Sequence, residues 1–333
     1  MPLPDALRDR LALPAIAAPM FLVSGPDLVV ETCRAGLIGT FPSLNQRTTE
    51  GYAAWLEEIE QKLAPNGGER PAPFGVNLIV HKSNPRVAAD LEVTVKHRVP
   101  VVITSLGANA EVVAAVHGYG GLVFHDVINM RHAEKAAAAG VDGLIPVCAG
   151  AGGHAGTISP FALVAEIRAF FDKTIILSGA ISTGRQVAAA LMLGADIAYL
   201  GTRFIATRES LAADAFKQMI VNARAGDIVY TPAISGVAGN FLRQSLIEAG
   251  FDPDNMPPKP EMNMDREKRE KKAWKHVWSA GQGVGSIADV PTVAELCARL
   301  KREYAEACAT LPRVAPPVAR MSEATSGMGF SIA

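Results

Sequence analysis

A glycine-rich loop with a single histidine is the stretch of this sequence whose residue types could do chemistry. Residues 141–156 read V-D-G-L-I-P-V-C-A-G-A-G-G-H-A-G, and the apolar run from Gly143 to Val147 is typical of a buried β-strand. The loop after it loses much chain entropy on ordering, and a flat or anionic ligand that needs close approach of backbone amides would offset that cost. His154 would then be the only titratable group on that surface. The alternative is a tight connection in which His154 only caps a helix.

Small residues also follow two later apolar stretches. Ser178-Gly179-Ala180 ends one of them, and Gly201-Thr202 ends the next. Turns of this kind leave backbone amides free to bind a phosphate, so the two together predict a phosphate-bearing cofactor. They are also compatible with ordinary tight β–α connections.

Eight apolar stretches would position these loops, and each is continuously apolar rather than alternating. Strands that are covered on both faces have this pattern, and parallel strands need helical crossovers between them. The sequence therefore predicts an α/β fold of the (β/α)8 TIM-barrel type, and no GxGxxG follows an early strand as a Rossmann domain would require. A helix is expected to begin at Glu209, after the last strand. The predicted strands are residues 13–19, 36–41, 74–79, 99–104, 121–126, 143–147, 174–178 and 196–200.

The pattern changes after Arg224, where glycine and proline become scattered. We expect residues 1–225 to form the barrel and residues 226–311 to form a smaller, mainly helical appendage over the barrel mouth. The last helix of that appendage, predicted over 291–311, could pack back on the barrel. A charge run at 265–272 is typical of a solvated helical face, and residues 312–333 are expected to be a tail.

Composition excludes several function classes. The 333 residues are 49% apolar and 20% charged with a net charge of −1, so neither nucleic acid nor a membrane surface is an expected partner. No apolar run approaches the about 20 residues that a membrane span needs. The four cysteines and the histidines lack metal-ligand spacing, and no signal peptide is recognisable, so we expect no metal and a cytoplasmic setting. Cys148 is interpreted as a small buried apolar residue rather than a reactive thiol.

Five segments together resemble the nitronate monooxygenase family, formerly called 2-nitropropane dioxygenases. The resemblance covers about residues 13–290 and implies an FMN-dependent barrel with a smaller domain over the flavin. The segments are A-P-M (18–20), F-G-V-N-L (74–78), A-G-G-H-A-G (151–156), L-G-A-D-I-A-Y-L-G-T-R-F-I-A-T-R-E (193–209) and W-S-A-G-Q-G-V-G (278–285).

The resemblance also implies roles for single residues. His154 would be the catalytic histidine over the flavin face. The substrate pocket would include His125, Ser279 and Gly281. The cofactor-binding residues would be Pro19, Met20, Asn77, Gly152, Gly153, Ser178, Gly179, Ala180, Tyr199, Leu200, Gly201 and Thr202.

The implied reaction is oxidative denitrification of alkyl nitronates, and of nitroalkanes, with dioxygen. The products would be a carbonyl compound and nitrite, and no nicotinamide would be required. An imidazole with an unperturbed pKa near about 6.5 can remove the proton next to a nitro group at neutral pH. Arg203 could anchor the cofactor phosphate or form an ion pair between barrel and helix. A homodimer is left open.

Three positions depart from relatives of this family. The end of the sixth strand often carries Gln where this chain has Pro146-Val147, and the end of the fifth often carries Lys where it has Asp126, although His125 could supply a cation there. The second glycine of the turn after the seventh strand is Ala180, a change that keeps the backbone amide.

Two other functions remain open. The first is an FMN-dependent NAD(P)H:quinone or enoyl-thioester reductase, which rapid anaerobic bleaching of the flavin by NADH would favour. The second is a flavin-storing or protein-interaction barrel without turnover, which a purified protein without a flavin absorption band would favour.

Overall fold

The computed structural model describes residues 3–65, 70–260 and 277–310. The predicted charge run at 265–272 and the predicted tail at 312–333 lie outside these residues. The described part contains no helix that is both long and apolar enough to cross a membrane.

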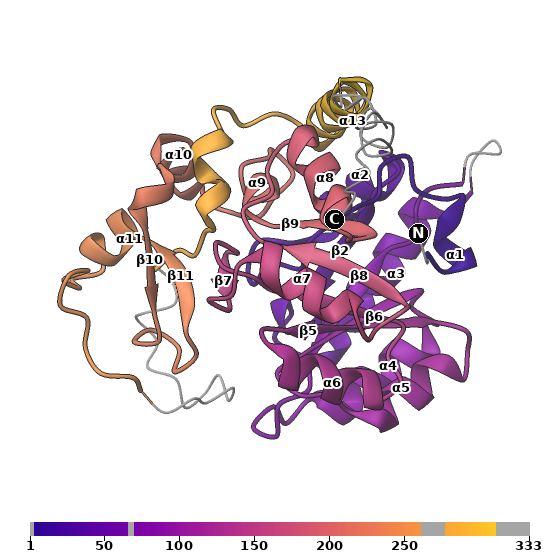
Figure 1. The fold of residues 1–333 in the computed structure, drawn as a ribbon. Helices are drawn as coiled ribbons and strands as arrows, with labels where there is room; N and C mark the ends of the chain where they lie inside the picture. Colours follow the sequence, from indigo (N-terminus) through magenta and orange to yellow (C-terminus); the bar gives the residue numbers. More distant parts are fainter. Residues whose placement is uncertain (1–2, 66–69, 261–276, 311–333) are drawn as a thin grey trace, which may run out of the picture.

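Eight parallel strands close into a barrel, which confirms the predicted (β/α)8 fold (Figure 1). β1 closes it by pairing with β2 on one side and β9 on the other, where Ile16 lies opposite Ile38 and Tyr199. Most strand residues are buried, because helices cover the outside and side chains fill the inside. The barrel strands are β1 (Ala15–Ala17), β2 (Ile38–Pro42), β3 (Gly75–Ile79), β4 (Val101–Ser105), β5 (Leu122–Val127), β6 (Gly143–Pro146), β8 (Thr174–Ser178) and β9 (Ile197–Leu200).

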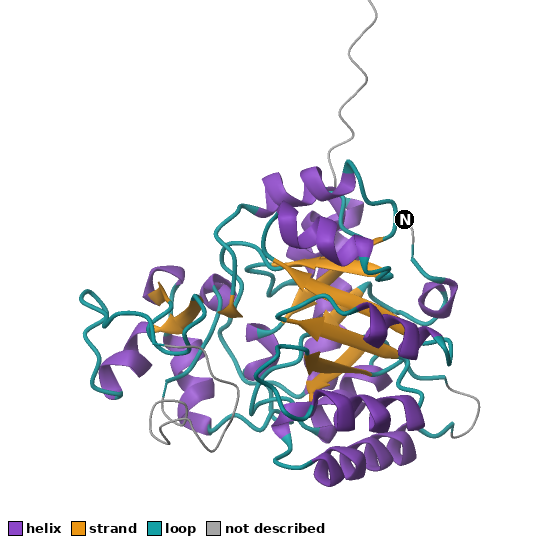
Figure 2. Cartoon of the chain, turned by 90° about the horizontal axis from the view of Figure 1, so that it is seen from below, coloured by secondary structure: helices purple, strands orange, loops and turns teal. Residues whose placement is uncertain are grey.

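Helices surround these strands, as Figure 2 shows from below. Their starts follow local capping chemistry: Asn129 caps α6 through its side chain, and Thr183 with Gln186 forms a capping box at α8. The helices on the barrel are α1 (Asp5–Arg8), α2 (Pro26–Arg34), α3 (Thr49–Leu63), α4 (Val87–Lys96), α5 (Ala110–His117), α6 (Met130–Ala138), α7 (Pro160–Arg168), α8 (Gly184–Met192) and α9 (Thr202–Ile205), with the 3-10 turn η1 (Ser43–Asn45) before α3.

The last described helix, α13 (Val293–Ala309), packs on the barrel helices α8 and α2. Gly184, the first residue of α8, lies against the α13 backbone, and a Cβ atom there would be 2.5 Å from the amide nitrogen of Tyr304. The Gly184 amide donates a 2.8 Å hydrogen bond to Oε2 of Glu303. A residue without a side chain therefore permits this close helix contact.

The segment after β9 differs from the prediction. A helix was expected to begin at Glu209, but the short α9 begins at the turn itself and α10 (Asp214–Asn222) begins later. The buried hydroxyl of Ser210 donates to the carbonyl of Ile205, which holds an irregular connection between the two helices.

The appendage lies beside the barrel (Figure 1). It was predicted to be mainly helical, but it also contains a small sheet. β11 (Gly239–Leu242) pairs antiparallel with β10 (Ile228–Thr231) and with β7 (Gly153–His154). Because β7 is part of the glycine-rich loop, the appendage fixes the backbone at His154. The other elements are η2 (Ala225–Asp227), α11 (Arg243–Glu248) and η3 (Gln282–Ser286).

Candidate active site

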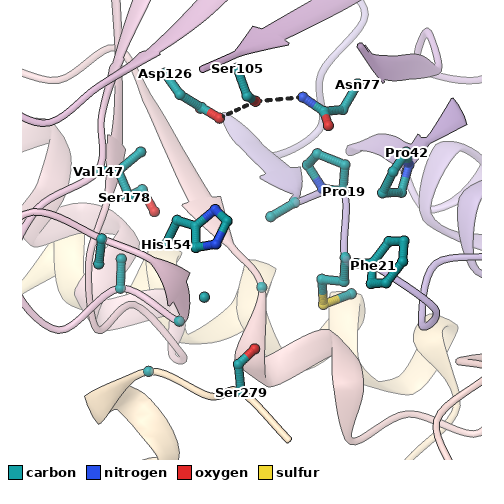
Figure 3. A pocket seen from close by; sticks show the side chains of 18 of the residues that line it. Pro19, Phe21, Pro42, Asn77, Ser105, Asp126, Val147, His154, Ser178 and Ser279 are labelled. Carbon is teal, nitrogen blue, oxygen red and sulfur yellow. Dashed lines mark hydrogen bonds between the residues drawn. The ribbon is translucent and has the colours of Figure 1, made fainter. Parts of the chain in front are cut away.

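A cavity of about 1180 Å³ lies at the carboxyl ends of the barrel strands, beneath the appendage. Its walls come from the loops after the strands and from parts of the segments 211–216, 230–241 and 277–283. Figure 3 shows part of this lining. All predicted site residues except Leu200 line this one cavity. Leu200 is fully buried in the core between the strands and the helices, so its side chain cannot reach a ligand there.

His154 points into the cavity from β7 (Figure 3). Its Nε2 atom lies 3.1 Å from Oγ of Ser235, and this hydroxyl donates a 2.8 Å hydrogen bond to the carbonyl of Val237. Because the hydroxyl proton is used, Oγ acts as an acceptor and Nε2 carries the ring proton. The neutral ring therefore has its lone pair on Nδ1. His154 does not cap the next helix, since Ser159 caps α7.

The glycine loop and the appendage touch through their backbones. The Gly281 amide donates to Oγ1 of Thr202 at 2.8 Å, and the Gln282 amide donates to the Gly150 carbonyl at 2.8 Å. A Cβ atom on Gly281 would lie 2.7 Å from the amide nitrogen of Gly152. Glycine at position 281 therefore allows the backbone of the appendage to contact the backbone of the glycine-rich loop.

The turns after β8 and β9 present unpaired amides to the cavity. Among the described residues, none accepts a hydrogen bond from the backbone amides of Gly179, Ala180, Gly201 or Thr202. Ala180 has φ +54°, a left-handed conformation that a non-glycine residue rarely adopts. Leu22 and Leu106, which also line the cavity, share this feature. Backbone strain is thus concentrated around the cavity, as it often is at functional sites.

A hydrogen-bonded chain of three polar side chains crosses the cavity wall (Figure 3). Asn77 Nδ2 donates to Oγ of Ser105 at 2.7 Å and to the Ile103 carbonyl at 3.2 Å. Both amide protons are used, so Asn77 offers its Oδ1 atom as an acceptor. Ser105 Oγ donates to Oδ2 of Asp126 at 2.6 Å. No partner for the buried Oδ1 of Asp126 exists among the described residues, and burial raises the pKa of Asp126 to about 6.

The side chains of His125 and Tyr199, which also line the cavity, are uncharged at neutral pH. His125 bonds to Thr104 through Nδ1 at 2.7 Å, and burial lowers the pKa of His125 to about 4. His125 therefore cannot supply the cation suggested for this end of β5. Burial raises the pKa of Tyr199 well above its usual value, so its phenol stays protonated.

The wall at the end of β1 is held through the backbone of Met20. The Met20 amide donates to Oγ of Ser24 at 3.0 Å, and its carbonyl accepts from Nδ2 of Asn45 at 3.0 Å. These bonds fix the backbone next to Pro19, which lies across the cavity from His154 (Figure 3).

Burial and contacts decide between the alternative roles of Arg203 and of Cys148. Arg203 is 2% exposed and donates to the carbonyls of Ala206 and Asp289, with Asp289 Oδ1 at 3.3 Å, so it forms the ion pair rather than a phosphate contact. Cys148 is fully buried, and burial raises the pKa of its thiol to about 12, so it is a buried apolar residue.

Sequence reasoning missed several lining residues. Ser105 ends β4 with no motif around it, and its role becomes visible only through its contacts with Asn77 and Asp126. Arg131 and Lys135 lie four residues apart on α6, a spacing that places them on one helix face. That spacing, together with the position after a barrel strand, could have identified them.

Comparison with known proteins gives one family. A family model described as nitronate monooxygenase matches residues 7–303. A nitronate monooxygenase of Paraburkholderia phytofirmans is 26% identical, with 91% of this chain and 95% of that protein covered. The solved structure of a nitroalkane oxidase from Streptomyces ansochromogenes superimposes with a TM-score of 0.79 at 27% identity, covering 92% of this chain and 100% of the other.

A second kind of relative matches over a shorter range. A (3aS,4S,5R,7aS)-5-hydroxy-7a-methyl-1-oxo-octahydro-1H-indene-4-carboxyl-CoA dehydrogenase of Rhodococcus jostii is 28% identical over 243 residues. The match covers 73% of this chain and 66% of that protein, so the chain spans just under two thirds of that relative's length.

Proposed function

The chain belongs to the nitronate monooxygenase family, and we propose that it is an FMN-dependent oxidoreductase that converts alkyl nitronates and dioxygen into a carbonyl compound and nitrite. Family membership implies a flavin cofactor. The observation that carries the proposal is that His154 and the turns after β8 and β9 line the same cavity. One bound nucleotide would therefore reach both the imidazole and the turns that would hold its phosphate.

The residues present fit a flavin nucleotide. The four unpaired amides of Gly179, Ala180, Gly201 and Thr202 suit a phosphate group, which accepts several hydrogen bonds at once. Asn77 Oδ1 suits a ring N–H, because its amide protons are used elsewhere. A bound flavin would supply electron transfer between the substrate and dioxygen.

A residue of the chain itself would remove the proton next to the nitro group. In the neutral ring of His154, Nδ1 can accept the proton from the carbon next to a nitro group, while Ser235 holds Nε2. The charged imidazolium would then stabilise the nitronate anion next to it. The appendage would limit access of water, because Gly281 and Gln282 close on the glycine loop.

The test is direct. Purified protein loaded with FMN should consume dioxygen and release nitrite when it is mixed with preformed alkyl nitronates of several chain lengths. Loss of nitrite release in the FMN-free protein, with recovery on adding FMN, would assign the reaction to the cofactor. Flavin-loaded protein that releases no nitrite from any nitronate would disprove the proposal.

A second candidate is a flavin-dependent reductase or dehydrogenase that acts on a thioester. The carboxyl-CoA dehydrogenase relative and the large cavity favour it. Rapid anaerobic bleaching of the flavin by NADH or by an acyl-CoA substrate would support this second function.

A further inference from the structure

Four basic side chains that follow β2, β3 and β5 along the chain line the cavity. We call Arg47, Arg86, Arg131 and Lys135 the basic arc; all four line the cavity. Arg86 is held by Asp90 at 2.8 Å and by the Gln46 carbonyl at 2.7 Å. The side chains of the other three are exposed, and no hydrogen bond or ion pair joins them to any described residue. They are therefore available to a ligand.

The basic arc lies across the mouth from the turns that would hold a flavin phosphate. Its members follow β2, β3 and β5, whereas the glycine turns follow β8 and β9. In the closed order β1-β2-β3-β4-β5-β6-β8-β9, the middle of the first group lies opposite the pair β8 and β9. A phosphate bound at the turns would leave the arc free for another anion.

Charge in the cavity is unbalanced. Asp126 is the one acidic residue among the described lining residues, and it lies on the cavity wall rather than in the arc. Burial, with the neighbouring Arg131 and Lys135, lowers the pKa of His132. In a protein with a net charge of −1, such a cluster concentrates positive potential at one entrance.

The mouth is apolar as well as basic. Leu22, Ile128, Leu211 and Tyr230 line the cavity while 36–56% of each remains exposed. Large, partly exposed apolar side chains that line one cavity indicate a binding surface. The cavity of about 1180 Å³ also exceeds the roughly 300–1,000 Å³ of a site for one small ligand.

We propose that the basic arc binds the phosphorylated tail of a substrate whose other end is an apolar group that reaches the flavin, as in an acyl thioester of coenzyme A. The proposal rests on the proposed function only for the position of the flavin. Apolar and basic side chains around one cavity favour such a molecule over a dinucleotide, which has no large apolar part. Guanidinium groups recognise phosphate well because they donate two parallel hydrogen bonds.

The test uses the FMN-loaded protein and isothermal calorimetry, so binding is measured independently of turnover. The probes are hexanoyl-coenzyme A, coenzyme A, hexanoate and NADPH. We expect hexanoyl-coenzyme A to bind best and hexanoate weakly. The double variant Arg131→Gln/Lys135→Gln should weaken hexanoyl-coenzyme A about 10-fold to 100-fold. Hexanoate binding should not change.

Lys96→Gln is the matched control, because Lys96 is exposed at the carboxyl end of α4, away from the cavity mouth. It should leave hexanoyl-coenzyme A affinity unchanged. Equal affinity in the wild type and the double variant would overturn the proposal, as would tighter binding of NADPH than of hexanoyl-coenzyme A. The flavin absorption band and nitrite release, measured on the same samples, report separately on the proposed function.

Discussion

Oγ of Ser105 lies 2.6 Å from Oδ2 of Asp126 and donates its proton to it, while the buried Oδ1 of Asp126 has no partner within the described structure. Burial makes Asp126 costly to ionise, and the hydrogen bond from Ser105 offsets only part of that cost. Its pKa is about 6, against an ordinary value of 3.8, so between these two pH values the folded state binds more protons than the unfolded state. The free energy of unfolding should therefore fall as pH rises from about 4 to 6.

Asp126→Asn should remove this dependence. The amide keeps an acceptor for Ser105 but cannot ionise. The free energy of unfolding of the variant, taken relative to that of the wild type, should therefore be roughly 2–3 kcal/mol higher at pH 7 than at pH 3.5. Urea titrations at both pH values, at equal FMN concentration, measure the difference. A variant that follows the wild-type pH curve would show that another group causes the slope.

His154→Ala tests the proton transfer in the proposed function. The variant should keep FMN, because the unpaired amides lie on the turns after β8 and β9. Its rate with neutral nitroalkanes should fall about 10²-fold to 10⁴-fold, because the general base is lost. With preformed nitronates the loss should be smaller, since the proton has already left. Equal losses with both substrate forms would exclude the general-base role.

Ser235→Ala tests the orientation of His154. Ser235 accepts from Nε2, so its removal should lower kcat with nitroalkanes about ten-fold and leave KM nearly unchanged. The acidic limb of the pH profile should shift, because the tautomer with its lone pair on Nδ1 is no longer favoured. With preformed nitronates the rate should stay close to wild type. A change in KM alone would argue for a structural role.

Gly184→Ala tests the packing of α13 on the barrel. A methyl group there would press on the α13 backbone at Tyr304 and cannot be relieved by moving a side chain. We expect the free energy of unfolding to fall by about 1–3 kcal/mol. Thermal and urea denaturation measure it, with Gly226→Ala as control because a Cβ atom at 226 meets nothing within 4 Å. An unchanged stability would mean that α13 shifts freely.

The barrel was predictable because each strand is continuously apolar, a pattern that depends on local sequence alone. The segment after β9 was not, since Ser210 and the start of α10 are fixed by tertiary contacts. In the candidate site, glycines and His154 were visible as a motif. Asp126, by contrast, gains its raised pKa from burial. That burial, and its contact with Ser105, exist only in the folded barrel, where the ends of β4 and β5 meet.

The same limit applies to β7. No sequence pattern predicts a two-residue strand, and Gly153–His154 becomes one only because β11 lies beside it. The position of the histidine therefore depends on a segment about 85 residues further along the chain, near Gly239 and Asn240. Leu200 shows the converse: a residue inside a matching motif can face the core rather than the ligand.

Gly281→Ala tests how the appendage closes the site. The added methyl group would meet the backbone of Gly150 and Gly152, so the segment would have to move away from the glycine loop. We expect weaker FMN binding, by about ten-fold, because the loss of the hydrogen bond from Gly281 to Thr202 disturbs the turn after β9.

Fluorescence titration of FMN-free protein with FMN measures this change, because flavin emission responds to binding. Gly226→Ala is again the matched control, since it adds the same methyl group in open space on the appendage. Gly281→Ala should also raise the rate at which a small quencher reaches the bound flavin, because the cover over the cavity no longer closes. Wild-type affinity together with wild-type quenching would show that residue 281 does not control closure of the site.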